Sequence, residues 1–271
     1  MSNKLSYYKN LTNRLSIENE FNFFLKIKLH LNDKDIHINK DRSLSKKEQN
    51  LIEDFFLNAE KGLPLDYILN SSEFYENNFY VDSRVLIPRS ETEILVDYVN
   101  KNFTSPIKVL DAGTGSGCIG ISIALKNKHF DVYGTEYSNE SLSVASINKK
   151  SLKAKNYSLI NADWLKCFKE KSFDVIVSNP PYIDKDDEHL NDLKHEPYNA
   201  LVAKDRGLGA IKEIVSQSSL VLKKKGVLII EHGYNQKTQV ENIFKKNHFS
   251  NIENIMDFSS IPRITIGTLI I

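Results

Sequence analysis

Apolar residues recur at helical spacing, with charged residues between them, over roughly the first seventy residues of the chain. Leu11 and Leu15 begin this pattern, and Phe21 and Phe24 continue it. Such spacing places the apolar side chains on one face of each helix, where they can pack together. We therefore predict a small helical domain over residues 1–72.

The clearest helix start in this region is at Ser45. Glu48 follows three residues later, which is the spacing of a capping box. One apolar stripe comes next, formed by Leu51, Ile52, Phe55, Phe56 and Ala59. Gly62 and Pro64 then favour the end of the helix.

Between Phe74 and Pro88 the pattern becomes alternating and rich in aromatic residues, which is typical of short strands. Asn77 and Asn78 interrupt it with a residue type that hairpin turns favour. We predict a β-hairpin linker over residues 73–90, with its turn at the two asparagines.

Strands and helices alternate from Ile107 onward. The predicted strands are 107–112, 130–136, 157–162, 173–178, 227–231 and 264–271, and the predicted helices are 117–126, 139–150, 209–222 and one after Glu231. This alternation is typical of an α/β fold with a doubly wound, mostly parallel, Rossmann-like sheet. We predict that residues 91–271 form this domain and that its ligands bind at the carboxyl ends of the strands.

Composition narrows the class of protein. Hydrophobic residues make up 41% of the chain, as in a folded globular protein. The 36 Lys and Arg residues nearly balance the 35 Asp and Glu residues, so the net charge of +1 gives no support for nucleic acid as the main partner. Cys118 and Cys167 are too few for a disulfide framework or a structural zinc site, which favours a reducing compartment.

The chain begins without the apolar run of a signal peptide, and its longest apolar stretches have the length of strands. We therefore expect a cytoplasmic protein with no membrane partner, and we also expect a monomer. His189, His195 and His232 lack the spacing of metal ligands, so no metal is expected.

A glycine-rich loop joins the first strand of the predicted sheet to its first helix. Gly115, Gly117 and Gly120 alone satisfy the dinucleotide fingerprint. Glu136 lies 21 residues beyond the first of them, at the end of the next strand. An enzyme that uses a nicotinamide cofactor is therefore one candidate. Asp111 argues against it, because a carboxylate beside the loop would repel a pyrophosphate.

S-adenosylmethionine is the second candidate cofactor, since it carries a cationic sulfonium and no phosphate. The glycines would let the backbone approach it closely, and Glu136 would accept hydrogen bonds from both ribose hydroxyls. The loop by itself leaves the choice between the two cofactors open.

The tetrapeptide Asn179-Pro180-Pro181-Tyr182 directly follows the apolar strand 173–178. It therefore lies at the same edge of the sheet as the glycine loop. The two prolines remove two N–H donors and stiffen the backbone. The Asn179 side-chain oxygen and the Pro180 carbonyl then form a pair of acceptors that can hold both hydrogens of a planar NH2 group.

Such a pair suits methyl transfer to a planar nitrogen. This nitrogen is a poor nucleophile because its lone pair is delocalised. Holding both hydrogens aims it at the methyl carbon and stabilises the positive charge of the transition state, so no strong general base is needed. Tyr182 can pack its ring against the planar group. Asn179, Pro180 and Tyr182 are therefore the candidate catalytic residues.

Together these features resemble the class I S-adenosylmethionine-dependent methyltransferases that modify planar amino groups. Among these, the chain is most similar to the peptide chain release factor glutamine methyltransferases. The segments that carry the resemblance are 64–68, 74–75, 86–93, the glycine loop, 163–164, 179–183, 196–197, 200–201 and 231–233. The helical N-terminal domain and the hairpin match the layout of the family as well.

The resemblance implies methylation of the side-chain amide nitrogen of the Gln in a release factor's Gly-Gly-Gln motif, with the helical domain docking the release factor. It implies that Glu136 holds the cofactor ribose and that Asp163 and Trp164 lie at the adenine. Asn179 would contact both cofactor and substrate, and residues 179–182 would clamp the Gln amide. The methionine part of the cofactor would lie on Gly113, Thr114, Gly115, Ser116 and Gly117.

Other substrates stay open at this point. Ser90 stands where the family usually has Pro, and a related family that methylates a Gln of a large-subunit ribosomal protein often has Pro-Arg-Ser. Glu91 and Glu93 favour the release factor branch. An adenine-N6 nucleic-acid methyltransferase uses the same acceptor pair on a flipped base, but the balanced charge and the lack of a basic arm argue against it. A cofactor-binding module without catalysis would not need the paired acceptors.

Three further residues have two interpretations each. Trp164 could belong to the core instead of the cofactor site. Arg89 could line the site or form a surface ion pair with Glu91. Glu196 could contact the substrate or lie in a turn.

Overall fold

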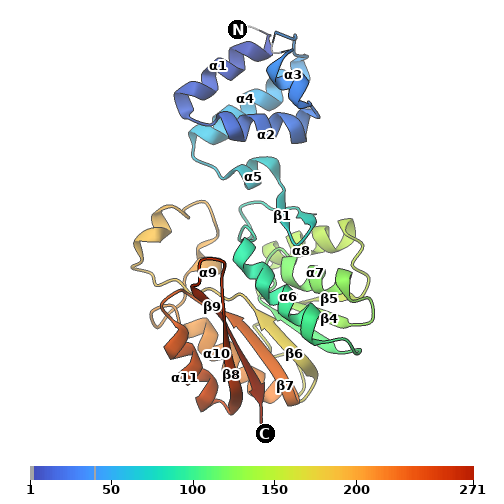
Figure 1. Ribbon diagram of the computed structural model, residues 1–271, viewed down its shortest axis with the longest axis vertical. Coiled ribbons are helices and arrows are strands. Elements are labelled where there is room, and N and C mark those ends of the chain that lie inside the picture. Colours follow the sequence, from blue (N-terminus) through green and yellow to red (C-terminus); the bar gives the residue numbers. More distant parts are fainter. Residues whose placement is uncertain (1–2, 40) are drawn as a thin grey trace. The chain divides into compact units, whose positions relative to one another are not determined.

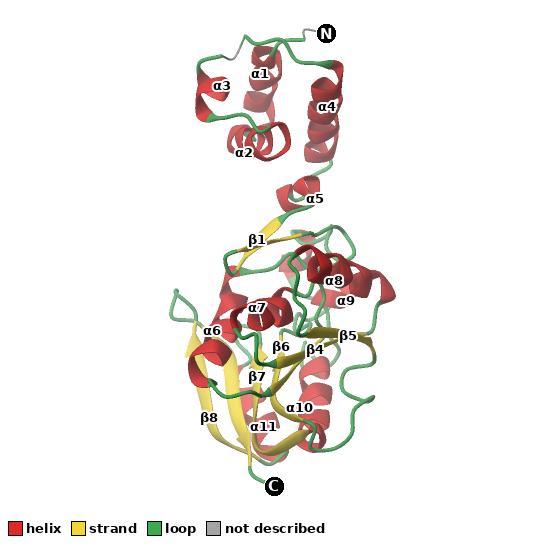
Figure 2. Cartoon of the chain, turned by 90° about the vertical axis from the view of Figure 1, so that its right-hand side faces the viewer, coloured by secondary structure: helices red, strands yellow, loops and turns green. Residues whose placement is uncertain are grey.

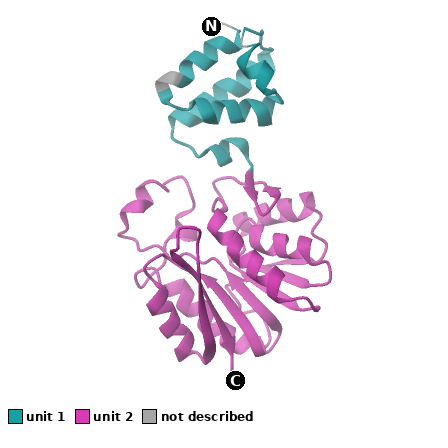
Figure 3. Cartoon of the chain, in the orientation of Figure 1, with its two compact units in different colours: residues 1–71 teal, residues 72–271 magenta. Residues whose placement is uncertain are grey.

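The computed structural model describes residues 3–39 and 41–271. They form two compact units, Met1–Ser71 and Ser72–Ile271 (Figure 3). None of the helices in these described ranges is long and apolar enough to cross a membrane.

The N-terminal unit is helical, as the apolar spacing predicts. Its helices are α1 (Leu5–Leu15), α2 (Glu18–Leu29), α3 (Asp33–His37), α4 (Lys46–Glu60) and α5 (Leu65–Leu69). Aromatic side chains dominate its core, where Phe21, Phe55 and Phe56 are packed ring against ring. The predicted capping box starts α4: the Ser45 hydroxyl accepts from Glu48 N at 3.3 Å, and Glu48 Oε2 accepts from Ser45 N at 2.7 Å.

A short hairpin, β1 (Ser72–Phe74) and β2 (Asn77–Phe79), opens the second unit. Its turn lies at Tyr75 and Glu76, whose φ angles of 46° and 63° are those of a two-residue primed turn. The predicted turn at Asn77 and Asn78 was wrong, because both asparagines belong to β2. The observed register buries Phe74 and Phe79 in the same core cluster, and this packing outweighs the preference of asparagine for a positive φ.

The rest of the unit is built on a seven-stranded sheet with the order β5-β4-β3-β6-β7-β9-β8. The strands are β3 (Lys108–Ala112), β4 (Asp131–Glu136), β5 (Tyr157–Asn161), β6 (Phe173–Ser178), β7 (Leu222–Glu231), β8 (Phe249–Met256) and β9 (Pro262–Leu269). The strands from β5 to β7 are parallel, and β9 and β8 are added antiparallel at one edge. The prediction of a mostly parallel sheet is confirmed, but it lacks β8.

Helices cover both faces of the sheet (Figures 1 and 2). One face carries α6 (Glu93–Asn102), α7 (Cys118–Lys126) and α8 (Asn139–Ser151), and the other carries α10 (Gly209–Val221) and α11 (Lys237–Lys246). Alternate residues of β3 point to opposite faces of the sheet. Val109 packs in the hydrophobic cluster on the first face, here called the first core cluster, and Leu110 packs in the hydrophobic cluster on the other face, the second core cluster. Shorter pieces are η1 (Ser90–Thr92), η2 (Glu188–Asn191) and α9 (Tyr198–Leu201).

The carboxyl ends of the central strands meet at one edge of the sheet. Asp111 of β3 is in register with Val177 of β6, and Ser178 of β6 is in register with Ile230 of β7. The glycine loop after β3, the tetrapeptide after β6 and the end of β7 therefore lie side by side. This edge carries the candidate site.

Candidate active site at the carboxyl edge of the sheet

The glycine loop turns sharply around the end of β4. Gly113, Gly115 and Gly117 have φ angles of 75°, 55° and 85°, which favour glycine. The N–H groups of Gly113 and Thr114 both donate to Thr135 O, at 2.9 and 2.8 Å. A Cβ at Gly115 would meet no atom within 4 Å, so this part of the loop faces open space. The loop thus offers bare backbone to a ligand.

Glu136 lies directly beside this loop, as its spacing predicts. Its Oε2 atom accepts from Gly115 N at 3.0 Å, and its Oε1 atom accepts from Ser138 N at 3.0 Å. Both carboxylate oxygens keep a free lone pair after these bonds. The two backbone bonds hold the carboxylate at the end of β4, where it can receive hydroxyl donors.

Trp164 closes the loop from the other side. Its ring lies so near Gly113 that a Cβ there would come within 2.7 Å of Trp164 Cζ3. The ring is half-buried against the second core cluster, so Trp164 belongs both to the core and to the wall of the loop. Asp163 lies in a more polar environment than Trp164: its half-exposed carboxylate forms an ion pair with Lys166.

The side chains of Thr114 and Ser116 turn into the protein. The Thr114 hydroxyl donates to Asp111 Oδ2 and contacts the Tyr157 hydroxyl, and all three groups are buried. Ser116 is also buried, and its carbonyl oxygen accepts from Asn148 Nδ2 at 2.8 Å. Both residues therefore present backbone rather than hydroxyl groups to the open side of the loop.

Asp111 lies beneath the loop rather than on its surface. Its Oδ2 atom accepts from Gly120 N at 3.0 Å as well as from Thr114, and burial raises its pKa to about 7. The carboxyl group stabilises the loop from inside. Its expected repulsion of a pyrophosphate is weaker than the sequence indicates, because the raised pKa keeps part of the carboxyl group protonated near neutral pH.

The tetrapeptide follows β6 without a break, and the Ser178 hydroxyl ties it to β3 by donating to Ala112 O at 2.6 Å. Asn179 Nδ2 donates to Thr92 Oγ1 at 3.0 Å. No group within residues 3–39 and 41–271 donates to Asn179 Oδ1, so this oxygen is an available acceptor. Pro180 is buried and Pro181 half-buried, and neither has an N–H group.

Tyr182 is held at both ends. Its hydroxyl donates to Glu231 Oε1 at 3.2 Å, and its carbonyl oxygen accepts from Gln236 Nε2 at 2.9 Å. Burial raises the pKa of its phenol well above the ordinary range. The ring packs against the second core cluster, and its hydroxyl is used within the protein.

Two residues of the site, Thr92 and Glu231, had no role in the sequence analysis. Both lie in segments that carry the family resemblance, and both are only 2% exposed. Burial raises the pKa of Glu231 to about 7. The Thr92 and Tyr182 hydroxyls and the Arg263 guanidinium act in the opposite direction, because they favour the ionised carboxylate. The sequence signal that could have pointed to Glu231 is its position as an acidic residue at the end of a central strand.

Arg89 forms an ion pair with Glu196, not with Glu91. The Glu196 carboxylate is buried and also accepts from Ile87 N at 2.9 Å. Glu91 instead accepts from the Ser90 hydroxyl at 3.2 Å. The pair joins the segment before η1 to the loop that follows the tetrapeptide, so both segments that flank the site are fixed to each other.

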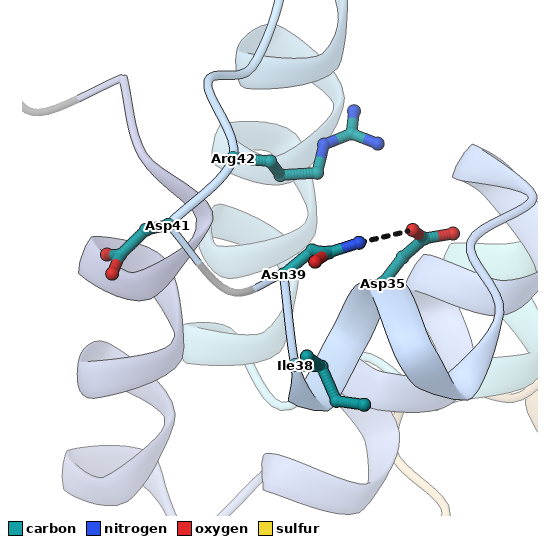
Figure 4. A pocket seen from close by; sticks show the side chains of 5 residues that line it. All are labelled: Asp35, Ile38, Asn39, Asp41 and Arg42. Atoms are coloured by element: carbon teal, nitrogen blue, oxygen red, sulfur yellow. Dashed lines mark hydrogen bonds between the residues drawn. The ribbon is translucent and has the colours of Figure 1, made fainter.

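An open depression elsewhere on the chain is lined by Asp35, Ile38, Asn39, Asp41 and Arg42 (Figure 4). All of these residues belong to the N-terminal unit, and none of them is a predicted site residue. Asn39 Nδ2 donates to Asp35 Oδ1 at 3.3 Å, and Arg42 pairs with Glu48. These polar groups therefore bond to one another and stabilise the N-terminal unit locally.

Comparison with known proteins adds to this geometry. Residues 103–262 match the model of a methyltransferase domain family. The chain is 40% identical over 238 residues to the release factor glutamine methyltransferase of Buchnera aphidicola subsp. Schizaphis graminum, covering 86% of this chain and 85% of the relative. It is 34% identical over 226 residues to the enzyme of that name from Coxiella burnetii, covering 83% and 82%.

Among solved structures, the chain resembles a methyltransferase from Pyrococcus furiosus. The TM-score is 0.55 at 16% sequence identity, and the match covers 82% of this chain and all of that one. This likeness confirms the fold of the sheet and its helices.

Proposed function

The chain belongs to the release factor glutamine methyltransferase family, and we propose that it methylates the side-chain amide nitrogen of the Gln in the Gly-Gly-Gln motif of release factors. The methyl donor is S-adenosylmethionine. One observation carries the assignment of the chemistry: the Asn179 amide is oriented by Thr92, with its oxygen available to an incoming NH2 group.

The residues of the site fit this cofactor, which when bound supplies an electrophilic methyl group on a cationic sulfonium. Glu136 has acceptor capacity for two ribose hydroxyls. The loop from Gly113 to Gly117 offers backbone to the methionine part, with Thr114 and Ser116 contributing through main-chain atoms. We assign the adenine to Trp164 and Asp163, and the packing of the Trp164 ring against Gly113 supports this assignment.

The acceptor amide is held by two oxygens of the tetrapeptide. Asn179 Oδ1 and the Pro180 carbonyl each accept one hydrogen of the Gln NH2 group. As the nitrogen bonds to the methyl carbon, the methyl–sulfur bond would break and the sulfur would leave as a neutral thioether. The nitrogen would become positively charged, so both oxygens would interact more strongly with its hydrogens in the transition state than in the ground state, and one of these hydrogens would then pass to water as a proton. Positioning and electrostatics therefore supply the rate enhancement, without a strong base.

The N-terminal unit is the proposed docking site for the body of the release factor. Several large apolar side chains remain exposed on it: Tyr7, Leu15, Phe23, Ile27, Ile38 and Leu57. Apolar side chains of this kind favour a protein partner over a nucleic acid. Release factors act in the cytoplasm, and we place the enzyme there.

A large-subunit ribosomal protein is a second candidate substrate because of Ser90. The Ser90 side chain is exposed and bonds to Glu91, whereas the side chains of Asn179 and Tyr182 bond to Thr92 and Glu231. The departure from the family pattern therefore lies outside the acceptor pair. The relatives from Buchnera aphidicola and Coxiella burnetii described above carry the release factor name, which favours that substrate.

The first experiment is transfer of a labelled methyl group to a purified release factor and to its Gly-Gly-Ala variant. Label on the parent and none on the variant would support both the reaction and the acceptor. Label only on the ribosomal protein, or only on DNA or RNA, would replace the proposed substrate. These acceptors are therefore assayed in parallel with the release factor.

A further inference from the structure

We propose that Gln236 is a positioning residue for the methyl transfer, which holds the end of the tetrapeptide and so directs the Pro180 carbonyl toward the substrate amide. Its side chain joins Tyr182 to two neighbouring loops. This inference rests on the proposed function, since it assigns a residue to that reaction.

The Gln236 side chain bonds to three backbone groups from three different segments. Its Nε2 atom donates to Tyr182 O at 2.9 Å and to Arg206 O at 3.3 Å. Its Oε1 atom accepts from Gly233 N at 2.9 Å. The residue is only 7% exposed, so water competes little for these bonds. The amide thus joins the tetrapeptide to the loop before α10 and to the loop after β7.

The orientation of the Gln236 amide follows from the chemistry of its partners, which are all backbone groups. A carbonyl oxygen can only accept a hydrogen bond, and a backbone N–H can only donate one. The NH2 end must therefore face the carbonyls of Tyr182 and Arg206, and the oxygen must face the N–H of Gly233. A flipped amide would lose all three bonds, so the partners select one orientation.

The carbonyl group of Tyr182 has little room to move. A Cβ at Gly207 would lie 2.0 Å from Tyr182 O and 2.7 Å from Gln236 Nε2, and Gly207 has a φ of 81°, which favours glycine. Directly after Tyr182, the N–H and C=O groups of Ile183 bond to a neighbouring segment at 2.9 and 3.0 Å. The peptide group that ends the tetrapeptide therefore has a defined direction.

The two prolines make this end of the tetrapeptide important for the reaction. Pro180 and Pro181 have no N–H group by which the protein could hold them, and their rings restrict φ. The direction of the Pro180 carbonyl therefore depends on how the tetrapeptide is held at its ends. Ser178 fixes the chain before the first end, and Gln236 holds the second end at the Tyr182 carbonyl. Release of the second end would misdirect one of the two proposed acceptors.

Gln236 and the glycine loop lie on opposite sides of the tetrapeptide. In the sheet, β6 lies between β3, which precedes the glycine loop, and β7, which precedes Gln236. A change at Gln236 should therefore affect the acceptor and leave the binding of S-adenosylmethionine nearly unchanged. A general loss of structure would affect both.

The test compares variants of Gln236 in the full-length enzyme. Gln236→Met keeps the length of the side chain and removes all three bonds. We expect it to lower kcat by about 10- to 100-fold, because a misplaced acceptor no longer aims the substrate nitrogen. The KM for the release factor and the Kd for S-adenosylmethionine should change less than about threefold. Gln239→Met, at an exposed position of α11, is the matched control and should keep the wild-type rate.

A second control separates positioning from stability. Val240→Ala removes buried side-chain atoms from α11 and should lower the Tm at least as much as Gln236→Met does. Val240 makes none of the bonds to the tetrapeptide described above. We therefore expect Val240→Ala to keep kcat within about twofold of the wild type at temperatures where both proteins are folded.

Gln236→Glu adds a dependence on pH that a purely structural role would not give. Its carboxyl group keeps an acceptor for Gly233 N, but only the protonated form can donate to Tyr182 O. Burial beside two carbonyl oxygens should raise the pKa of the introduced carboxyl group. The ratio of its kcat to that of the wild type should therefore rise by at least about fivefold as the pH falls from about 9 to about 6.

A measurement without substrate separates this inference from the proposed function. The Gly233 amide hydrogen, which donates to Gln236, should exchange slowly with solvent in the wild type and in Gln236→Glu. In Gln236→Met we expect its exchange, followed by NMR, to be at least about tenfold faster. If the wild type methylates no release factor, the proposed function fails, while the exchange of this amide still tests whether Gln236 holds the two loops and the tetrapeptide together.

Four results would overturn the inference. One is a kcat in Gln236→Met equal to that in Gln239→Met, and another is the same loss of kcat in Val240→Ala as in Gln236→Met. The third is a rise in the cofactor Kd of Gln236→Met as large as the fall in its kcat. The fourth is a kcat ratio of Gln236→Glu to wild type that does not change with pH, or a Gly233 amide that exchanges equally slowly in Gln236→Met.

Discussion

Gly113 and Trp164 are packed so tightly that a single added carbon on the glycine would reach the indole ring, at 2.7 Å from Cζ3. Gly113 also has a φ of 75°, which a residue with a side chain rarely adopts. The two constraints act together at this position. Gly115 has only the second, because open space lies where its Cβ would be.

Gly113→Ala should therefore destabilise the fold more than Gly115→Ala. The left-handed backbone costs each variant roughly 1–2 kcal/mol of unfolding free energy. Gly113→Ala must in addition displace the Trp164 ring, which should also weaken cofactor binding. Denaturant unfolding and calorimetric titration with S-adenosylmethionine measure both effects. Equal losses in the two variants would show that the ring contact contributes nothing.

Glu136→Ala should weaken the binding of S-adenosylmethionine. Hydrogen bonds to a charged group contribute about 1.5–3 kcal/mol each, so the loss of two of them should raise the Kd by roughly 100-fold or more. The variant should also lose the preference of the wild type for a ribose over a deoxyribose analogue of the cofactor. Glu140→Ala, an exposed acid in the first turn of α8, is the control. An unchanged Kd in Glu136→Ala would contradict the ribose role.

Asn179→Ala should strongly reduce methyl transfer and leave cofactor binding largely intact. It removes one of the two acceptors that stabilise the charged nitrogen, which typically lowers kcat by about 10²–10³-fold. Single-turnover transfer to the release factor measures the rate, and titration measures the cofactor Kd. Asn191→Ala, at an exposed position, serves as the control. Normal turnover in Asn179→Ala would refute the acceptor pair.

Asp111 should make the stability of the protein depend on pH. Its pKa is about 7 in the folded protein, above the usual 3.8, because burial and Glu136 outweigh the bonds from Thr114 and Gly120. Between these pH values the folded chain holds a proton that the unfolded chain releases. The stabilising contribution is therefore complete below about pH 4 and is lost as the pH rises toward 7, with a slope of at most about 1.4 kcal/mol per pH unit.

Asp111→Asn should flatten this part of the curve of unfolding free energy against pH. Asparagine keeps an oxygen that can accept from Thr114 and Gly120 but does not titrate. Urea unfolding between pH 4 and pH 8 measures the slope for the wild type and the variant. The exposed Asp192→Asn should leave the slope as it is. Parallel curves for the wild type and Asp111→Asn would exclude a raised pKa.

The sequence predicts most of the central fold because buried parallel strands are short apolar runs. The strand 173–178 is predicted with its observed ends, and neighbouring strands differ by one or two residues except β7, which begins at Leu222 rather than Val227. The prediction misses β8, where exposed polar residues such as Asn251 and Glu253 interrupt the pattern. An edge strand covered on one face needs fewer apolar residues than a central one.

The site, like the fold, has parts that the sequence predicts and parts that it does not. Glycines and the tetrapeptide act through backbone geometry, which local sequence determines, so their positions could be predicted. The orientation of the Asn179 amide depends on its bond to Thr92, which is 87 residues away in the chain and buried. A contact between such distant residues follows from strand order and helix packing. A single sequence does not specify it.

Strand β6 lies near the middle of the sheet, between β3 and β7, and its last four residues are fully buried. Amide hydrogens in such strands exchange with solvent only when the whole domain opens, whereas termini and surface loops open at low free energy. The acceptor atoms of the tetrapeptide follow this strand directly. We therefore expect them to stay in place until the strand itself opens, which is the least frequent opening in the domain. On heating, the ability to transfer a methyl group should persist until the sheet itself melts.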